Sequence, residues 1–389
     1  MMSLRNLHIA FVSHIFQFDK TPEELLQEYF TMVEWATAIA RQGVKVSVVQ
    51  RYVKTQTLVK DEVNYYFIAD GQVSRPNSSP MGFYKNVQQF VLKEQVDVIH
   101  LHDIRNTLMN MKLKRLFKNI PKVIQDHGSV FRINSWKDHL LKPFLRYGLR
   151  HMDRVMFAAK GQEENWTKHQ VIEESQCVFV MENSSPFAYS DRDTARAITK
   201  LQGAPVFLWV GNLNTNKDPF TVLRAFKKLL QNYPGARLYM IYRFADLEQE
   251  VKQWITNESL KVQVVLLGRQ DRNKLQHYYN SVDYFISASY KEGSGYAAIE
   301  AMSCGVVPIL THIPSFISLT KAGDVGTLFE PGNSEMLYQK ICSLLDKPLT
   351  QERGRVLNHF NQYFSFEAIA KQAIEVYQEV TSQSRGDGR

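Results

Sequence analysis

Residues 282–310, VDYFISASYKEGSGYAAIEAMSCGVVPIL, predict a strand, a loop, a helix, a glycine turn and a second strand. The loop at 291–296 opens directly onto the predicted start of the helix. At a helix start, backbone N–H groups without intrahelical partners and the positive end of the helix dipole attract phosphate. Gly293 and Gly295 allow the backbone to approach such a group closely. The stretch therefore predicts an α/β fold with an anion-binding loop.

Short apolar runs alternate with helical segments along the rest of the chain. The pattern predicts strands at 7–13, 44–50, 63–68, 96–101, 122–125, 154–157 and 177–180, and again at 206–210, 237–242, 262–266, 283–287, 306–310 and 326–329. It also predicts a helix over 22–41. Thr21 is the expected N-cap, and Gly43 is the glycine that stops the helix. Short apolar strands separated by helices indicate parallel sheets that helices cover on both faces.

The 389 residues hold two such series of strands, which indicates two domains. A polar stretch at 189–203 predicts a linker, with one Rossmann-like domain at 1–188 before it and a second at 204–364 after it. The helix expected at about 365–382 fits either domain. Rossmann-like sheets bind ligands at the carboxyl ends of their strands, so we expect a cleft between the two domains.

The net charge of +8 is unevenly distributed. Residues 105–160 contain 13 Lys and Arg against 3 Asp and Glu, and so carry +10 by themselves. A patch of this kind fits nucleic acid, an anionic membrane or a phosphorylated substrate. Within it, 131–150 places apolar side chains beside Lys and Arg at helical spacing. That pattern predicts either a membrane-binding helix or an ordinary helix packed on the sheet.

Three scattered cysteines favour a reducing compartment and offer no zinc-ligand spacing. The first ten residues show no export-signal pattern, and no apolar stretch is long enough to predict a membrane span. We therefore expect a cytoplasmic protein, with peripheral contact between 131–150 and the inner face of the membrane as an open alternative. Residues 191–193 have the D-x-D pattern of a metal site but lie in the predicted linker, and we expect no required metal or cofactor.

Two carboxylates frame the anion-binding loop. Glu300 lies eight residues after Glu292, and a mostly helical segment of that length separates them by roughly 10 Å. That separation matches a diphosphate, so the pair could hold a sugar at one end and a ribose at the other. The alternative is a loop charge and a solvated helix residue. The apolar neighbours of Glu300 argue against a solvated residue, because an unpartnered carboxylate among them is costly.

Residues 293–298, GSGYAA, also fit the dinucleotide fingerprint G-x-G-x-x-A. That fingerprint requires an acidic residue about 20 positions later for the ribose of the dinucleotide, and 313–320 contains none. The sequence therefore disfavours a dehydrogenase.

With these motifs the chain resembles the retaining GT-B glycosyltransferases, and most closely glycosyltransferase family 4. The family element E-G-x-G-x4-E is present from Glu292 to Glu300. The resemblance implies a GT-B architecture, in which two Rossmann-like α/β domains face each other across a cleft. It also implies that Glu292 contacts the transferred sugar and that Glu300 contacts the ribose hydroxyls of the donor. It assigns the amides of Ser294, Gly295 and Tyr296 to the donor phosphates, and Gly293 is a further donor-binding residue.

Residues 210–218, VGNLNTNKD, resemble the family loop V-G-R-L-x3-K-G. The resemblance assigns Gly211, Asn212 and Lys217 to the donor, with Lys217 holding the diphosphate. A cation there would neutralise the charge that develops on the leaving phosphate. Asn212 replaces the Arg of the family, and Asp218 replaces its Gly. Arg243, after the next strand, is the candidate for the missing cation, against the alternative of an ordinary surface Arg.

Histidines mark the first domain. Residues 97–102 resemble the family's D-V-I-H-x-H strand, and 123–128 resemble a following strand that ends in His-Gly. The resemblance places His127 in the cleft near the reacting sugar, and a capping or core-edge His is the alternative. We expect His100 and His102 to alternate across their strand, so that at most one faces the cleft. His14 lies where many relatives carry Gly-Gly, and His14 and His102 are the acceptor-side candidates.

The sequence therefore predicts a metal-independent, retaining glycosyltransferase that moves a hexose or related sugar from a nucleoside diphosphate sugar to an acceptor hydroxyl. The predicted catalytic residues are His127, Glu292 and Lys217. Expected partners are the nucleotide sugar and a glycan, lipid-linked or other anionic acceptor, in glycan, polysaccharide or glycolipid assembly.

Three alternatives remain: a sugar-nucleotide epimerase, a phosphorylase on the same scaffold, and a non-catalytic nucleotide-sugar- or nucleic-acid-binding protein. RNA-binding modules usually carry stacking aromatics in a recognisable motif. The sequence shows no such motif, so we expect no nucleic acid partner.

Overall fold

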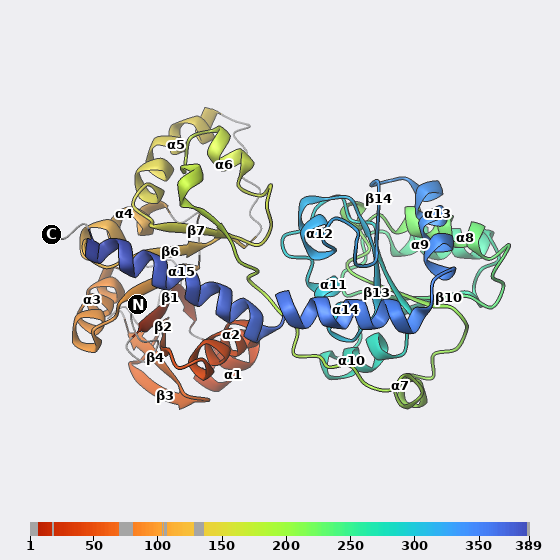
Figure 1. Cartoon of the computed structure of the whole chain (residues 1–389), viewed down its shortest axis with the longest axis horizontal. Coiled ribbons are helices and arrows are strands. Elements are labelled where there is room, and N and C mark those ends of the chain that lie inside the picture. Colours follow the sequence, from red (N-terminus) through yellow and green to blue (C-terminus); the bar gives the residue numbers. More distant parts are fainter. Residues whose placement is uncertain are drawn as a thin grey trace. The chain divides into compact units, whose positions relative to one another are not determined.

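The computed structural model describes residues 7–17, 19–69, 81–102, 104, 107–127 and 136–386. The chain divides into two compact units (Figure 1). Unit 1 consists of Met1–Asn183 together with Phe366–Arg389, and unit 2 consists of Ser184–Ser365. Each unit is an open α/β sheet with helices between its strands, as the alternating pattern of the sequence predicts.

Unit 1 contains an eight-stranded sheet in the order β3-β4-β2-β1-β5-β6-β7-β8. Its strands are β1 (His8–Gln17), β2 (Lys45–Tyr52), β3 (Gln56–Lys60), β4 (Val63–Ala69), β5 (Val98–His102), β6 (Lys122–Gln125), β7 (Arg154–Phe157) and β8 (Cys177–Phe179). Its helices are α1 (Pro22–Glu28), α2 (Phe30–Arg41), α3 (Met81–Glu94), α4 (Thr107–Leu116), α5 (Trp136–Leu149), α6 (Glu164–Lys168) and α15 (Phe366–Gly386). All neighbouring strands run parallel except β3, which pairs antiparallel with β4.

The predicted strands of unit 1 are all present, and β3 is an addition. It is a short edge strand whose side chains are mostly exposed, so its sequence lacks the apolar run that marks the others. The predicted helix over 22–41 is two helices, because the backbone at Tyr29 leaves the helical region between α1 and α2. Thr21 caps α1 in a capping box with Glu24, which confirms the predicted start of the helix.

The C-terminal helix α15 belongs to unit 1, although unit 2 precedes it in the chain. It packs beside α2, and Figure 1 shows it in blue across this unit. Its residues Ala370, Ala373 and Tyr377 are fully buried. The Tyr377 hydroxyl lies 2.5 Å from Nδ1 of His100, a buried residue of β5. The helix expected at about 365–382 therefore completes the first unit of the chain.

Unit 2 contains a six-stranded parallel sheet in the order β11-β10-β9-β12-β13-β14. Its strands are β9 (Val206–Val210), β10 (Arg237–Ile241), β11 (Val264–Gly268), β12 (Tyr284–Ser287), β13 (Val307–Thr311) and β14 (Thr327–Phe329). Its helices are α7 (Arg192–Thr199), α8 (Pro219–Leu229), α9 (Glu248–Asn257), α10 (Arg272–Asn280), α11 (Tyr296–Ser303), α12 (Pro314–Leu319), α13 (Ser334–Leu345) and α14 (Leu349–Tyr363). The central strands β12 and β13 are buried along their whole length, as strands covered on both faces must be.

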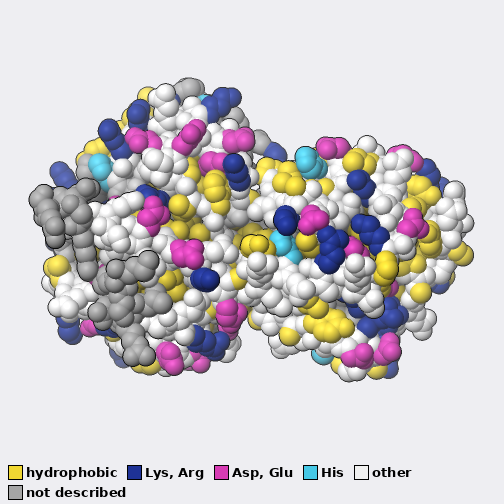
Figure 2. Space-filling view, in the orientation of Figure 1, with side chains coloured by type: hydrophobic (Ala, Val, Ile, Leu, Met, Phe, Trp, Pro, Cys, Tyr) yellow, Lys and Arg dark blue, Asp and Glu magenta, His cyan; other side chains and the backbone are white. Residues whose placement is uncertain are grey.

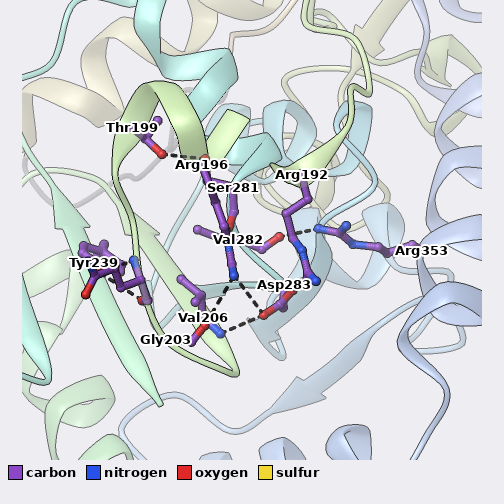
Figure 3. A network of polar contacts seen from close by, with 11 residues as sticks. Arg192, Arg196, Thr199, Gly203, Val206, Tyr239, Ser281, Val282, Asp283 and Arg353 are labelled. Atoms are coloured by element: carbon purple, nitrogen blue, oxygen red, sulfur yellow. Dashed lines mark hydrogen bonds and ion pairs between the residues drawn. The ribbon is translucent and has the colours of Figure 1, made fainter. Parts of the chain in front are cut away.

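The segment 189–203 is part of unit 2 rather than a linker. It contains α7, which packs on α10, and Asp191 of the D-x-D pattern caps α7 by accepting a hydrogen bond from the Thr194 N–H. The segment is polar because its arginines form ion pairs with the buried carboxylate of Asp283. Arg192 and Arg196 lie 2.7 and 3.7 Å from the side chain of Asp283, which also accepts a hydrogen bond from the Val206 N–H (Figure 3).

Candidate functional site

A cavity of about 330 Å³ lies in unit 2 at the carboxyl ends of β9 and β12. Its lining includes every residue predicted to bind the donor except Arg243, Gly293 and Ser294. Those lining residues are Gly211, Asn212, Lys217, Glu292, Gly295, Tyr296 and Glu300. They come from two loops and a helix that are far apart in sequence. Parallel α/β sheets bind ligands at this edge of their strands.

Lys217 and Glu292 form an ion pair in the wall of this cavity. Lys217 ends a short 3₁₀ turn, and Asn214 caps this turn by accepting a hydrogen bond from the Lys217 N–H. The Asn216 side chain donates to the Lys291 carbonyl at 3.0 Å, which joins the two loops. Both ionised groups are largely buried, with 21% and 15% of their side chains exposed. The structure therefore holds a cation and an anion against each other where a charged ligand would lie.

Glu300 is buried within α11 and lies on the cavity, with only 3% of its surface exposed. The Tyr279 hydroxyl donates a hydrogen bond to Oε2 of Glu300 at 2.9 Å. Nη1 of Arg272 lies 3.2 Å from Oε1 as an ion pair, but Oε1 accepts no aligned hydrogen bond. Burial raises the pKa of Glu300, and the nearby charge of Arg272 opposes that rise. Glu300 is therefore no solvated helix residue, and its Oε1 atom has an ion-pair partner but no aligned hydrogen-bond donor among the described residues.

The start of α11 depends on Gly295. This residue has φ +72°, and a Cβ atom there would lie 2.7 Å from the Phe316 ring, so that only glycine fits. The helix begins at Tyr296, and the segment between Glu292 and Gly295 is not helical. The expected spacing of roughly 10 Å assumed a mostly helical segment. That assumption is wrong for the first half of the segment.

The two departures from the family loop have structural explanations. Asp218 adopts a left-handed backbone, with φ +37°, which is the conformation that a glycine would supply. Its carboxylate then caps α8 by accepting hydrogen bonds from the N–H and hydroxyl of Thr221. The side-chain Oδ1 of Asn212 accepts a hydrogen bond from the Phe244 N–H at 3.4 Å and ties this loop to the segment that follows β10.

Arg272, rather than Arg243, is the arginine that lines the cavity. The guanidinium of Arg243 lies over the exposed ring of Phe244, 4.9 Å from its centre. Arg272 begins α10 and reaches the Tyr296 hydroxyl at 2.5 Å as well as Glu300. The sequence analysis missed Arg272 and Tyr279. Neither belongs to a motif, and only their position beside a buried acidic side chain indicates a role.

His127 follows β6 in unit 1, at the carboxyl edge of that sheet. Half of its side chain is exposed, and its Nδ1 atom contacts the buried carboxylate of Glu182. Its Nε2 atom lies 3.3 Å from Nδ1 of His102. A carboxylate at Nδ1 fixes the ring orientation and selects the tautomer that carries its proton on Nδ1. Glu182 is thus a further residue that the sequence analysis did not assign to the site.

The prediction that His100 and His102 alternate across their strand is wrong. Residues two positions apart point to the same face of a strand. The two rings accordingly stack at 4.7 Å, and the ring of His102 also stacks on that of His127 at 5.4 Å. Burial lowers the pKa of His100 to about 3 and that of His102 well below its ordinary value. Both rings are therefore neutral. His102 packs directly against the ring of His127, and His100 packs against His102.

His14 lies in β1, but its side chain is outside the described residues. In the described part of the chain, no three His, Cys, Asp or Glu side chains come together as metal ligands. No helix there is both long enough and apolar enough to span a bilayer.

Both halves of the chain match models of known protein families. Residues 191–357 match the model described as "Glycosyl transferases group 1", and residues 31–180 match "Glycosyltransferase Family 4". The chain belongs to the family 4 glycosyltransferases. The resemblance inferred from the E-G-x-G-x4-E element is thereby confirmed, and the chain falls in a family of enzymes.

Curated relatives of this family 4 protein include two mannosyltransferases. The GDP-mannose:cellobiosyl-diphosphopolyprenol alpha-mannosyltransferases of Xanthomonas oryzae pv. oryzae and Xanthomonas campestris are 23% and 27% identical to it. The matches cover 64% and 60% of this chain, and the same shares of the two relatives. The N-acetyl-alpha-D-glucosaminyl L-malate synthase of Bacillus anthracis is 24% identical over 74% of this chain and 76% of the relative. The chain therefore matches less than two thirds of the length of the two mannosyltransferases.

Solved structures confirm the GT-B fold. The sucrose-phosphate synthase of Thermosynechococcus elongatus covers 97% of this chain with its whole length, at 19% identity and a TM-score of 0.69. HepE of Anabaena, solved with UDP and glucose, covers 96% at 16% identity and a TM-score of 0.66, again over its whole length. The two Rossmann-like units of this family 4 protein are thus of the expected class.

Proposed function

We propose that the protein transfers a hexosyl group from a nucleoside diphosphate sugar to an acceptor hydroxyl, with retention, in the assembly of a glycan, polysaccharide or glycolipid. The observation that carries this proposal is the composition of the cavity in unit 2. A cation, two carboxylates and the start of a helix surround one space of about 330 Å³. Those groups correspond to the diphosphate, the sugar and the ribose of such a donor.

Three side chains of the cavity then have distinct roles. Oε1 of Glu300 accepts a hydrogen bond from a ribose hydroxyl, because it is buried and accepts no aligned bond within the protein. Lys217 and the N–H groups at the start of α11 bind the diphosphate. Glu292 accepts hydrogen bonds from the hydroxyls of the sugar. Stabilisation of the departing diphosphate by a preorganised cation is the main contribution to catalysis.

Donor binding in this scheme exchanges charge partners. The ion pair between Lys217 and Glu292 separates when the ammonium pairs with the diphosphate and the carboxylate accepts hydrogen bonds from the sugar. The pair keeps both side chains in position before the donor arrives, which lowers the entropic cost of forming the site.

On the acceptor side, we propose that His127 acts beside the reacting sugar, oriented by Glu182. Its half-exposed ring lies at the carboxyl edge of the unit 1 sheet, where α/β sheets bind ligands. His102 contacts His127 through Nδ1 while its Nε2 atom is buried, and we propose that it contributes through His127.

A donor panel tests this function. Thermal stability and product formation are measured with UDP, GDP, ADP and their sugars, with and without a lipid-linked or soluble glycan acceptor. A shift with one nucleotide and a new glycosidic product supports the proposal. Conversion of the donor alone into an isomer would indicate an epimerase, and release of a sugar phosphate would indicate a phosphorylase. The absence of both a thermal shift and a product with every donor would overturn the proposal.

We also propose that the protein is cytoplasmic and contacts an anionic membrane through α5. Four apolar side chains on this helix are exposed: Leu140, Leu141, Phe144 and Tyr147. Leu145 and Leu149 face the core instead, so the exposed side chains form a second apolar stripe on the helix. Figure 2 shows dark blue Lys and Arg side chains along the rim of unit 1 at this helix. An amphipathic surface with flanking cations is typical of a helix that lies in a membrane interface.

Vesicle flotation tests the membrane contact. The double variant Leu141→Ser/Phe144→Ser should release the protein from vesicles that contain anionic lipid. Leu92→Ser, at an exposed leucine of α3, is the matched control and should leave flotation unchanged. Equal flotation of all three proteins would contradict a role for α5.

A further inference from the structure

A second polar cavity, of about 410 Å³, lies within unit 1 at the amino ends of β6 and β7. The charged side chains that line it are Arg115, Lys118, Lys122, Arg150 and Asp153, beside His151. Lys122 is the first residue of β6, whereas His127 follows its last residue. The cavity therefore lies at the opposite edge of the sheet from His127 and Glu182, and the proposed transfer reaction does not use it.

The charges around this cavity are unbalanced. Asp153 is its one carboxylate among the described lining residues, and its Oδ2 atom already accepts a hydrogen bond from the Lys122 N–H. Across the described chain, no carboxylate lies within ion-pair distance of Arg115, Lys118 or Arg150, in contrast to the neighbouring Arg154, which pairs with Glu379. Positive groups gathered around one space repel one another, so an anion there would stabilise the arrangement.

Lys122 gives the cavity a fixed cation. Only 5% of the residue is exposed, and Nζ donates hydrogen bonds to the carbonyls of Phe117 and Ile120 at 2.9 and 2.7 Å. An ammonium has three donors, and these two contacts leave one for a ligand. Burial lowers the pKa of Lys122, which the charge of Asp153 opposes. Because its position is set by the backbone, this side chain loses little freedom when an anion binds.

We propose that this cavity is a binding site for a phosphate group with an organic substituent, separate from the donor site. Two guanidinium groups offer paired donors that match the oxygens of phosphate. The volume of about 410 Å³ is within the range of small-molecule sites and leaves room for the substituent. The phosphate belongs either to a soluble phosphate ester or to the headgroup of an anionic phospholipid. Arg150 directly follows α5, so a headgroup can reach the cavity from that helix.

The first arm of the test uses inorganic phosphate and glycerol phosphate as soluble probes. The full chain carries Lys217→Ala, which weakens phosphate binding at the donor site, and ionic strength is held constant with chloride. We expect a saturable rise in melting temperature. Arg115→Glu/Lys118→Glu should raise the apparent Kd at least tenfold, while Lys60→Glu, an exposed lysine of β3, should leave it unchanged. Arg115→Gln/Lys118→Gln replaces the double reversal if that variant does not fold.

The second arm uses vesicles of phosphatidylcholine with and without phosphatidylglycerol, on the same three proteins. Loss of binding to phosphatidylglycerol in the Arg115/Lys118 variant alone identifies the phosphate as a lipid headgroup. A response to soluble probes with equal vesicle binding of all proteins identifies a soluble ester. The proposal is overturned if neither the soluble phosphates nor the phosphatidylglycerol vesicles bind saturably, or if the Arg115/Lys118 variant binds both as well as Lys60→Glu does. Neither result depends on glycosyl transfer.

Discussion

The ammonium of Lys217 and the carboxylate of Glu292, 75 positions apart in sequence, are ion-paired in the cavity of unit 2. Each supplies the counter-charge of the other in the ligand-free protein. A ligand that takes the place of one partner must therefore also satisfy the other. A nucleoside diphosphate sugar does so, because its phosphates are anionic and its sugar carries hydroxyl donors.

Lys217→Ala should lower kcat at least tenfold without unfolding the chain, because the departing diphosphate loses its cation. Glu292→Gln should have an effect of similar size, measured by product formation at saturating donor. The matched control is Lys227→Ala, which breaks an exposed ion pair with Glu258 in the same unit. A near-normal kcat in both Lys217→Ala and Glu292→Gln would contradict the proposal that this cavity binds the donor.

Glu300→Gln should weaken donor binding about tenfold to hundredfold, since a hydrogen bond to a charged acceptor contributes about 1.5–3 kcal/mol. Calorimetric titration with the nucleoside diphosphate measures the change in Kd. Tyr279→Phe serves as a second variant, because it removes the donor that orients the carboxylate and leaves the charge. Wild-type affinity in Glu300→Gln would exclude a ribose contact at this residue.

The raised pKa of Glu300 also predicts a dependence of stability on pH. When the folded pKa exceeds the unfolded one, the folded state holds the proton more tightly. The contribution to stability is then complete below the ordinary value of 4.5 and is lost as the pH rises through the higher folded pKa. Glu300→Gln lacks this titration. Urea unfolding of both proteins should therefore show the wild type losing stability relative to the variant as the pH rises from about 4.5; a constant difference would contradict this.

Glu182→Gln should lower kcat while leaving the KM for the donor near its wild-type value, because Glu182 acts through the orientation of His127 and is not among the unit 2 residues that line the donor cavity. Steady-state kinetics with the donor varied separates the two parameters. Glu163→Gln, a carboxylate on the same unit that caps a loop N–H, is the comparison. A change in the donor KM alone, with kcat unchanged, would contradict the proposal that Glu182 orients His127.

Asp283→Ala should destabilise the protein by about 1–3 kcal/mol, because it leaves the buried Val206 N–H without its acceptor and the partly exposed Arg192 and Arg196 without their shared carboxylate. Chemical unfolding monitored by circular dichroism measures the loss. Glu335→Ala breaks an exposed pair with Lys228 and should cost less than about 1 kcal/mol. Equal effects of the two substitutions would show that the network in Figure 3 adds little to stability.

The sequence predicted the strands well, because parallel strands buried on both faces are continuous apolar runs. The same signal could not reveal β3, whose side chains are mostly exposed. It also could not place 189–203, since the polar residues that suggested a linker are there to meet Asp283, which lies 91 positions beyond Arg192.

The residues of the candidate site fall into two groups, those in local sequence motifs and those that only the tertiary structure brings to the site. Glu300, Lys217 and Gly295 lie in local motifs that the sequence analysis singled out, and all three line the cavity. Arg272, Tyr279 and Glu182 reach the site only through tertiary packing, and no local pattern marks them.

The position of α15 has a consequence for synthesis. Because unit 1 receives its last helix from residues that follow unit 2, a ribosome releases all of Ser184–Ser365 before unit 1 can close. Unit 2 is continuous and can fold during translation, whereas the growing unit 1 must wait with His100 and the face of α2 uncovered. The nascent chain thus completes its second half before its first, and a stop codon just before α15 would leave His100 without its Tyr377 partner.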